Sequence, residues 1–289
     1  MPEGQGPATT RRRLRFELRR LRDEKGLAQA DVVKQLDWSP SKLIRIENGS
    51  VGISVTDVRA LAGVYKAPEE AVDELVALAR VARGRRWWSS YRDIVSPQYQ
   101  EFIGFEADAS RLRQFHPCIV PGLLQIEPYV RALIPALLVS PLSEAHIEGH
   151  VQVRLRRQQE ILDGDTPPDF SVVIDEAALR RPVGGIETMR AQLQHIAEMQ
   201  RHESVTIAIL PFAAGPHVGM QGAFHIMEFA DAADDSMLYL ENAQQGDVAM
   251  RDQPELVDMY NKVFDGMLER SLRDGAAVDY LTKISKELT

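Results

Sequence analysis

The 289-residue sequence lacks several features that mark particular classes of protein. Cys118 is its only cysteine, so no disulfide can form within the chain, and the apolar context HPCIVPG predicts a buried thiol. No apolar run reaches the ~18 residues that a membrane-spanning helix needs. Residues 1–13 contain no apolar stretch of the kind found in secretory signals. We therefore expect a cytoplasmic protein.

The common signatures of enzymes are also missing. The sequence has no G-x-S-x-G elbow, no P-loop and no G-x-G-x-x-G turn. His146 and His150 are four residues apart on a predicted helix, which is a spacing of metal ligands, but no third ligand is evident. We expect this pair to lie on a solvated helix face, and we expect neither a metal, a cofactor nor a catalytic activity.

The charge is distributed unevenly along the chain. The net charge is −8, which by itself argues against binding to nucleic acid. However, residues 1–86 carry 17 Lys and Arg against 12 Asp and Glu, a net of +5, and residues 87–289 carry 17 against 30, a net of −13. A basic head on an acidic body is typical of a DNA-binding module joined to a domain with another role.

The basic head has the pattern of a compact all-α domain over residues 11–83, preceded by a flexible tail over residues 1–10. Leu14, Leu18 and Leu21 form one apolar stripe at helical spacing. Five short helices are predicted, at residues 11–25, 28–36, 39–47, 54–65 and 68–83. Arg11–Arg13 precede the first apolar position, and this run is either an arm that reaches DNA or a soluble tail.

Residues 27–49, LAQADVVKQLDWSPSKLIRIENG, predict a helix-turn-helix. A tight turn joins a short helix to a second helix, which has Pro40 at its first position. This arrangement allows the second helix to enter the major groove. Gln29 starts the first of these helices, where its amide and the free N–H groups can reach a phosphate. The exposed positions near the start of the second helix, where base edges would be read, are Ser39, Ser41, Lys42 and Arg45.

This segment resembles the helix-turn-helix of the phage-repressor/Cro type, also called the xenobiotic-response-element (XRE) family. The resemblance spans about residues 11–80 and rests on the spacing of Gln29, Ser39 and Glu47-Asn48-Gly49. It implies a structural ion pair between an arginine of the first helix, here Arg22, and Glu47. The alternative is an ordinary amphipathic bundle in which Lys42 and Arg45 are only solvated.

Residues 84–100 are predicted to be a hinge, with Trp87, Trp88 and Tyr91 packed against a domain or a second subunit. Residues 101–289 then form an α/β or α+β domain for regulation and dimerisation. Helices are predicted at 143–162, 186–200, 253–270 and 276–288, and β-branched strands at 170–174, 205–210, 224–229 and 237–240.

Polar residues of this second domain form two candidate pockets for a ligand or partner. One contains Asp175, Glu176, Arg180 and Arg181 at a strand end beside a glycine-rich turn. The other contains Glu106 and Arg111, with Arg113 nearby. Ion-pair networks imitate such sites, and we favour a structural network at the first. The loop from Pro211 to Gly222 is a candidate lid or partner-binding segment.

Four long stretches resemble the regulators of the WhiJ-like actinobacterial kind: WSPSKLIRIENG, EFIGFEADASRLRQFHPCIVPGLLQIEPYVRALI, VIDEAALRRPVGG and VTIAILPFAAGPHVGMQGAFHIMEF. The resemblance covers about residues 11–280 and implies a DNA-binding regulator, in many cases encoded beside a small partner protein. On the same comparison neither His116 nor Cys118 looks essential.

The sequence thus predicts a dimeric transcriptional regulator that binds double-stranded DNA, at the nucleoid when bound. Its second domain would sense a partner protein or a small ligand, with Gly84–Ser90 as the hinge. Two alternatives stay open: an antitoxin-like protein that neutralises a small partner and regulates its own operon, and an enzyme domain fused to a DNA-binding head.

Overall fold

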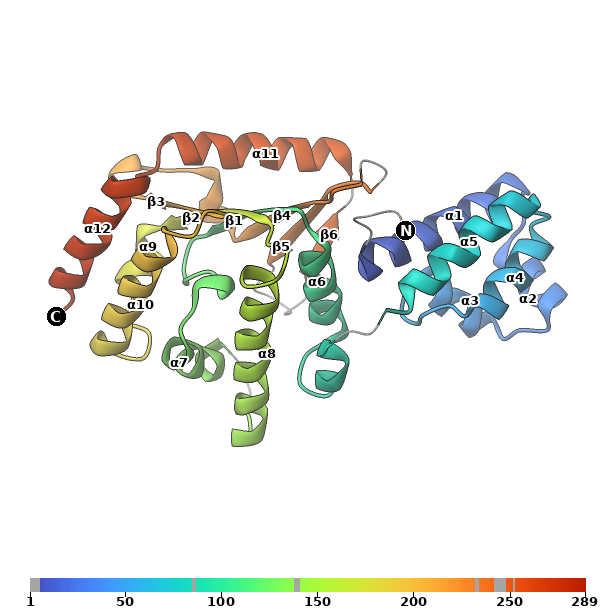
Figure 1. Cartoon of the computed structure of the whole chain (residues 1–289), viewed down its shortest axis with the longest axis horizontal. Helices are drawn as coiled ribbons and strands as arrows, with labels where there is room; N and C mark the ends of the chain where they lie inside the picture. Colours follow the sequence, from blue (N-terminus) through green and yellow to red (C-terminus); the bar gives the residue numbers. More distant parts are fainter. Residues whose placement is uncertain (1–5, 85–86, 138–140, 232–233, 242–247, 252) are drawn as a thin grey trace. The chain divides into compact units, whose positions relative to one another are not determined.

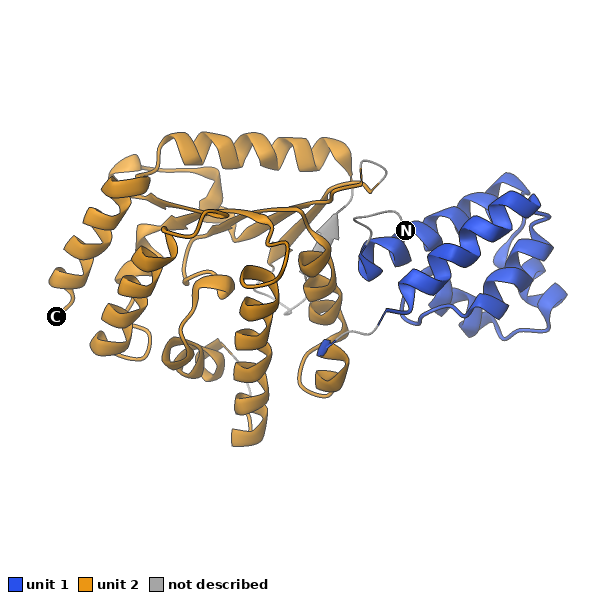
Figure 2. Ribbon diagram, viewed as in Figure 1, with its two compact units in different colours: residues 1–87 blue, residues 88–289 orange. Residues whose placement is uncertain are grey.

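The computed structural model describes residues 6–84, 87–137, 141–231, 234–241, 248–251 and 253–289. The chain divides into two compact units, Met1–Trp87 and Trp88–Thr289 (Figure 2). Within the described residues, no helix combines the length and the apolar character needed to cross a membrane.

The described residues of the first unit form five helices, as the sequence predicts. They are α1 (Pro7–Glu24), α2 (Gln29–Leu36), α3 (Pro40–Glu47), α4 (Val55–Val64) and α5 (Glu69–Ala82). Their apolar stripes meet in one core, whose fully buried members include Leu14, Val32 and Leu43. Burial of these stripes supplies most of the stability of such short helices.

The expected tail at residues 1–10 is wrong in its second half. Helix α1 begins at Pro7, and its first turn includes Thr9, whose hydroxyl donates to the Gly6 carbonyl (3.0 Å). Proline suits the first position of a helix because its missing N–H has no partner there. The other part of the predicted tail, residues 1–5, lies outside the described residues.

The predicted hinge at residues 84–100 is also largely structured. Residues Trp87–Tyr91 form the 3-10 helix η1, and Trp88 is buried. Helix α6 (Pro97–Asp108) begins inside the expected hinge, with the Ser96 hydroxyl accepting a hydrogen bond from the Tyr99 N–H (3.2 Å). Residues 85–86 of the hinge lie outside the described residues.

The part of the second unit that the structure describes is built on a mixed sheet of six strands, in the order β3-β2-β1-β4-β5-β6. Strands β1 (Arg111–His116), β2 (Asp169–Asp175) and β3 (Val205–Leu210) are parallel to one another. Strands β4 (Phe224–Glu228), β5 (Met237–Glu241) and β6 (Val248–Arg251) continue the sheet in antiparallel fashion. This arrangement confirms the predicted α/β or α+β domain.

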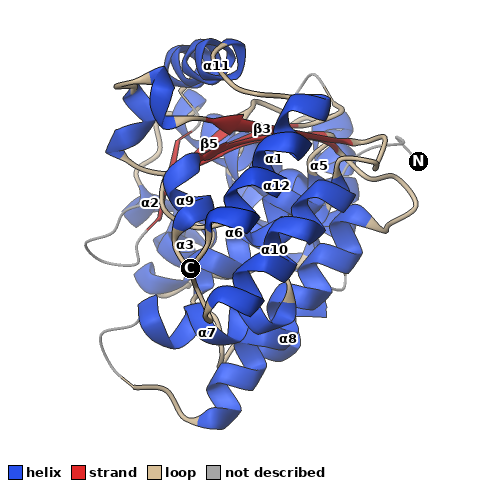
Figure 3. Ribbon diagram, turned by 90° about the vertical axis from the view of Figure 1, so that its left-hand side faces the viewer, coloured by secondary structure: helices blue, strands red, loops and turns tan. Residues whose placement is uncertain are grey.

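Helices cover both faces of this sheet (Figures 1 and 3). One face packs on α11 (Pro254–Glu269), where Phe264 meets Phe115 and Ile226 in one apolar cluster. The other face carries α6, α7 (Glu127–Leu137), α8 (Glu144–Leu162), α9 (Glu176–Arg180) and α10 (Ile186–Met199). The last helix, α12 (Asp274–Glu287), lies against α10 through hydrogen bonds from Arg190 to the Ser285 and Leu288 carbonyls. Because parallel strands end at a common edge, the side chains that follow β1, β2 and β3 are brought together there.

Candidate nucleic-acid interface

A tight turn sets α3 against α2. Asp37 ends α2 in the left-handed conformation (φ 54°), and the Trp38 N–H donates to the Val33 carbonyl (2.9 Å). Ser39 then takes the N-cap position and Pro40 the first turn of α3. This chain reversal buries Leu43 and Ile46 and leaves the opposite side of α3 in solvent, which is the arrangement of a helix that reads the major groove.

The buried Glu47 carboxylate anchors the end of α3. The Arg22 guanidinium lies beside it, with Nε 2.8 Å from Oε1, and the Gln29 amide donates to Oε2 (2.7 Å). Burial lowers the pKa of Arg22, but hydrogen bonding and charge attraction from Glu47 outweigh it and raise the pKa overall. The ion pair that the resemblance implies is therefore present, and it joins α1, α2 and α3.

Two more arginines of α1 contact the same end of α3. Arg15 donates to the Asn48 carbonyl (3.4 Å) and Arg19 to the Glu47 carbonyl. Arginines suit this position because the last carbonyls of a helix lack intrahelical donors and carry partial negative charge. Neither Arg15 nor Arg19 was predicted from the sequence. Arg19 and Arg22 follow Arg15 by four and seven residues, and this spacing places all three arginines on one side of α1.

Two of the predicted contact residues, Ser41 and Arg45, lie on the exposed side of α3 together with Ile44 and Asn48. Ser41, Ile44, Arg45 and Asn48 are exposed and follow one another at helical spacing, so they form a single stripe, here called the α3 stripe. Arg45 donates to the Ser41 carbonyl of its own helix (3.2 Å), and Ile44 is 45% exposed. Ser39 is exposed beside the stripe, with its hydroxyl 3.2 Å from that of Ser41.

Lys42 lies on the flank of this stripe and is held in place. Its ammonium donates to Asp57 of α4 (2.6 Å) and lies 3.6 Å from the centre of the Trp38 ring. Burial raises the pKa of Asp57, but hydrogen bonds from Lys42 and Ser54 outweigh this effect and lower it overall. Lys42 is thus part of the α3–α4 contact, a role that its spacing from Arg45 did not indicate.

Gln29 is placed differently from the prediction that its amide reaches a phosphate. Its amide nitrogen donates to Glu47, so the side chain belongs to the anchor of α3. The backbone N–H groups of the first turn of α2 are still located at Gln29. The Asp31 carboxylate accepts a hydrogen bond from the Ala28 N–H (3.1 Å). A phosphate contact at this point would therefore use the backbone of α2.

The first predicted pocket of the second unit is a network of paired charges. Glu176 accepts from Arg180 (2.5 Å), the Phe212 N–H (2.7 Å) and the Tyr280 hydroxyl (2.8 Å). Arg180 also donates to Glu287 of α12 (2.9 Å). Burial raises the pKa of Glu176, but these hydrogen bonds outweigh it and lower the pKa overall. The favoured structural network is what the side chains form here.

Neighbouring residues of that pocket point elsewhere. Asp175 accepts from the Ala177 N–H (2.8 Å), and its other oxygen lies 3.1 Å from the ring of His217. Arg181 is exposed. The loop that holds His217, a candidate lid, forms two short 3-10 helices, η3 (Phe212–Ala214) and η4 (Val218–Gln221).

The predicted grouping of Glu106 with Arg111 and Arg113 is wrong. Glu106 is buried and forms a bidentate ion pair with Arg157 of α8, whose Nη2 lies 2.6 Å from Oε1. Arg111 instead pairs with Asp169 (3.0 Å) at the edge of β1. Because side chains alternate between the faces along a strand, Arg111 and Arg113, two positions apart, share one face of the sheet, the face that packs on α11. Glu106 lies on the opposite face of the sheet. Cys118, expected to be buried, is exposed.

Comparison with protein families agrees with the two units. A helix-turn-helix domain model matches residues 13–75, and the model of a domain of unknown function, DUF5753, matches residues 99–283. The chain belongs to the DUF5753 family. The helix-turn-helix match supports a DNA-binding regulator. Neither a curated protein nor a solved structure matches the chain.

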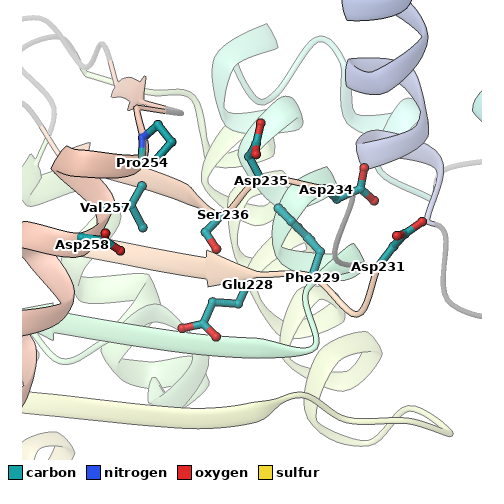
Figure 4. A pocket seen from close by; sticks show the side chains of 9 residues that line it. All are labelled: Glu228, Phe229, Asp231, Asp234, Asp235, Ser236, Pro254, Val257 and Asp258. Atoms are coloured by element: carbon teal, nitrogen blue, oxygen red, sulfur yellow. The ribbon is translucent and has the colours of Figure 1, made fainter.

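The DUF5753 domain contains a pocket of about 340 Å³ beside the ends of β4 and α11 (Figure 4). Five of its lining residues are acidic. The lining residues are Glu228, Phe229, Asp231, Asp234, Asp235, Ser236, Pro254, Val257 and Asp258. Because the carboxylates give this hollow a negative potential, it is unsuited to nucleic-acid phosphates.

Proposed function

We propose that the chain is a sequence-specific, dimeric transcriptional regulator of the phage-repressor/Cro type, in which α3 enters the major groove of double-stranded DNA. The observation that carries the proposal is the α3 stripe, an exposed row of side chains on α3. The opposite side of this helix is buried in the core, and its C-terminal end is held by the contacts of Glu47. Arg45 would donate to a guanine edge, Ser41 and Asn48 would hydrogen-bond to bases or phosphates, and Ile44 would contact a thymine methyl group.

The other predicted contacts have supporting roles in this proposal. The first turn of α2 would bind a phosphate through backbone N–H groups. Lys42 would remain paired with Asp57 and would help to hold α3 against α4. Since the head carries a net charge of only +5, we infer that two heads are needed for tight binding, about 34 Å apart on a near-palindromic site.

We propose that the DUF5753 domain provides dimerisation and senses a partner protein or a small ligand. We propose no catalytic role for it. The support is that Glu106, Glu176 and Asp175, the carboxylates singled out in the sequence, are engaged in structural hydrogen bonds.

The test uses the full chain and an operator selected from random DNA. Arg45→Ala removes one exposed guanidinium from the α3 stripe, and a base-contacting arginine is worth about 1–3 kcal/mol, roughly a 5- to 160-fold change in Kd. Binding is measured by gel shift on the selected site and on sites changed at single positions. We expect weaker binding and relaxed preference at one position of each half-site.

The matched control is Arg80→Ala, which removes the same charge from an exposed position on α5. Its effect should be small and uniform across sequences. Wild-type affinity and sequence preference in Arg45→Ala would show that α3 does not read the bases.

A further inference from the structure

Three metal-ligating side chains meet in the DUF5753 domain where the sequence predicted none. His116 is the last residue of β1, His225 the second of β4 and Glu241 the last of β5. In the sheet register His225 lies opposite Gln114 on one side and Tyr239 on the other. His116 and Glu241 follow those two residues by two positions, so all three side chains share one face of the sheet.

The spacing of the donor atoms suits a single ion. One donor atom from each residue lies within 4.8 Å of the other two, and His225 Nε2 is already 3.2 Å from Glu241 Oε1. The two imidazole rings are 4.9 Å apart and nearly perpendicular, at 88°. Two ligands of a tetrahedral zinc ion, each about 2.1 Å from the metal, lie about 3.4 Å apart. The observed separations, at most 4.8 Å, therefore exceed this ideal by about 1.4 Å at most.

The hydrogen bonding of the histidines is incomplete without a further partner. Both ring nitrogens of His116 and Nδ1 of His225 are buried and have no hydrogen-bond partner among the described residues. Both histidines are only 2% exposed. Because a neutral imidazole carries one donor and one acceptor, a buried ring with neither satisfied is costly. A bound cation would use one of these free lone pairs.

The surroundings restrict the orientation of one ligand and leave another open to solvent. The rings of Phe102 and Tyr239 pack at 5.2 Å from His225 and restrict its orientation. The Glu241 side chain is 42% exposed, which gives an ion a path from solvent.

We propose that His116, His225 and Glu241 bind one divalent cation of the zinc class. Two imidazoles and a carboxylate are the donor set of three-ligand zinc sites, which keep the fourth position for water or another ligand. Such an ion would join β1, β4 and β5 at the edge where the parallel strands end. The proposal is independent of the α3 stripe and of DNA binding.

The test titrates full-length protein, first stripped of metal with a chelator, with Zn²⁺ in competition with a chromophoric chelator. We expect one tight equivalent per chain. Loss of a direct ligand in Glu241→Gln should weaken binding at least as much as loss of an outer-shell partner, which costs 10- to 100-fold. Substitution by Co²⁺ should give visible absorption bands of a four- or five-coordinate ion in the wild type only.

The control is the double variant His146→Ala, His150→Ala, which removes the helical histidine pair on α8 and should keep the tight equivalent. The proposal is overturned if the wild type binds no more tightly than Glu241→Gln, or if the double variant loses the site. A second measurement does not depend on any variant. Zn²⁺ should raise the thermal midpoint of the stripped wild-type protein, and an unchanged midpoint overturns the proposal as well.

Discussion

The Glu47→Gln substitution tests how the α3 stripe is held in position. It preserves the size of the side chain and one acceptor oxygen, but it removes the negative charge beside Arg22. In the wild type Glu47 is 6% exposed and Arg22 14% exposed, and the carboxylate accepts from Arg22 and from Gln29. After the substitution Arg22 keeps the Leu27 carbonyl (2.9 Å) and the exposed Asp23.

The expected magnitude follows from this geometry. Removing one partner of a buried ion pair costs about 3–5 kcal/mol, because the other charge stays desolvated. Arg22 retains some access to water, so we expect a loss of about 3 kcal/mol in the free energy of unfolding of the first unit. Small domains are stable by only about 5–15 kcal/mol, so this loss would be easily measured.

Hydrogen exchange with mass spectrometry is the suitable assay because it reports each unit separately. Amides of α1, α2 and α3 should exchange faster in Glu47→Gln, while those of the DUF5753 domain should not change. The double variant with Arg22→Met should be more stable than the sum of the two single changes predicts, by about 0.5–3 kcal/mol. Arg156→Met, which breaks an exposed pair with Glu160, serves as the control and should have little effect.

Unchanged exchange of α1–α3 in Glu47→Gln would show that the ion pair does not hold α3 in position, and so would effects of Glu47→Gln and Arg22→Met that simply add. Additive effects would mean that the two side chains do not depend on each other, and that the end of α3 is fixed by apolar packing alone. In that case DNA binding by Glu47→Gln should also be close to that of the wild type.

Two further predictions concern other charged contacts. Glu106→Gln leaves the buried Arg157 guanidinium without its counter-ion, and we expect the DUF5753 domain to lose about 3–5 kcal/mol in urea unfolding. Asp57 has a lowered pKa in the folded state through Lys42 and Ser54, so its contribution to stability is present above the unfolded pKa near 4 and is lost as the pH falls through the folded value. Asp57→Asn should therefore make the stability of α4, followed by hydrogen exchange between pH 3 and 6, less dependent on pH than in the wild type.

The helices of the first unit could be predicted because their signals are local. Apolar positions at 3.6-residue spacing, Pro40 at a helix start and Gly49 at a helix end are all visible within a few residues. Helix α3 and its exposed Arg45 follow from the same signals. The contact between Lys42 and Asp57 joins residues 15 positions apart on different helices, and no local pattern indicates it.

The second unit was predicted less completely because its polar residues find distant partners. Strand β1, with the sequence RLRQFH, looks too polar for the centre of a sheet. Arg113 is accommodated because it donates to Asn261 of α11 (2.7 Å), a residue 148 positions away. The Glu176–Arg180 pair is local and visible in the sequence, but Tyr280 joins it from 104 positions away. Spacing along the chain therefore identifies charged residues without identifying what they pair with.

The topology of the sheet explains why the histidine cluster is visible only in three dimensions. Strand β1 ends at His116, and β4 runs antiparallel beside it, so the start of β4 lies at the same edge as the end of β5. At that edge the other face of the sheet carries a second polar pair, Asp175 and His217. Both oxygens of Asp175 have partners, from Ala177 and His217. Among the described residues His217 lacks a partner only at Nδ1, whereas both ring nitrogens of His116 lack one. Two clusters of similar composition thus differ in what they lack, and it is the unmet hydrogen-bonding capacity of His116, rather than the presence of histidines, that distinguishes a candidate cation site from a structural pair.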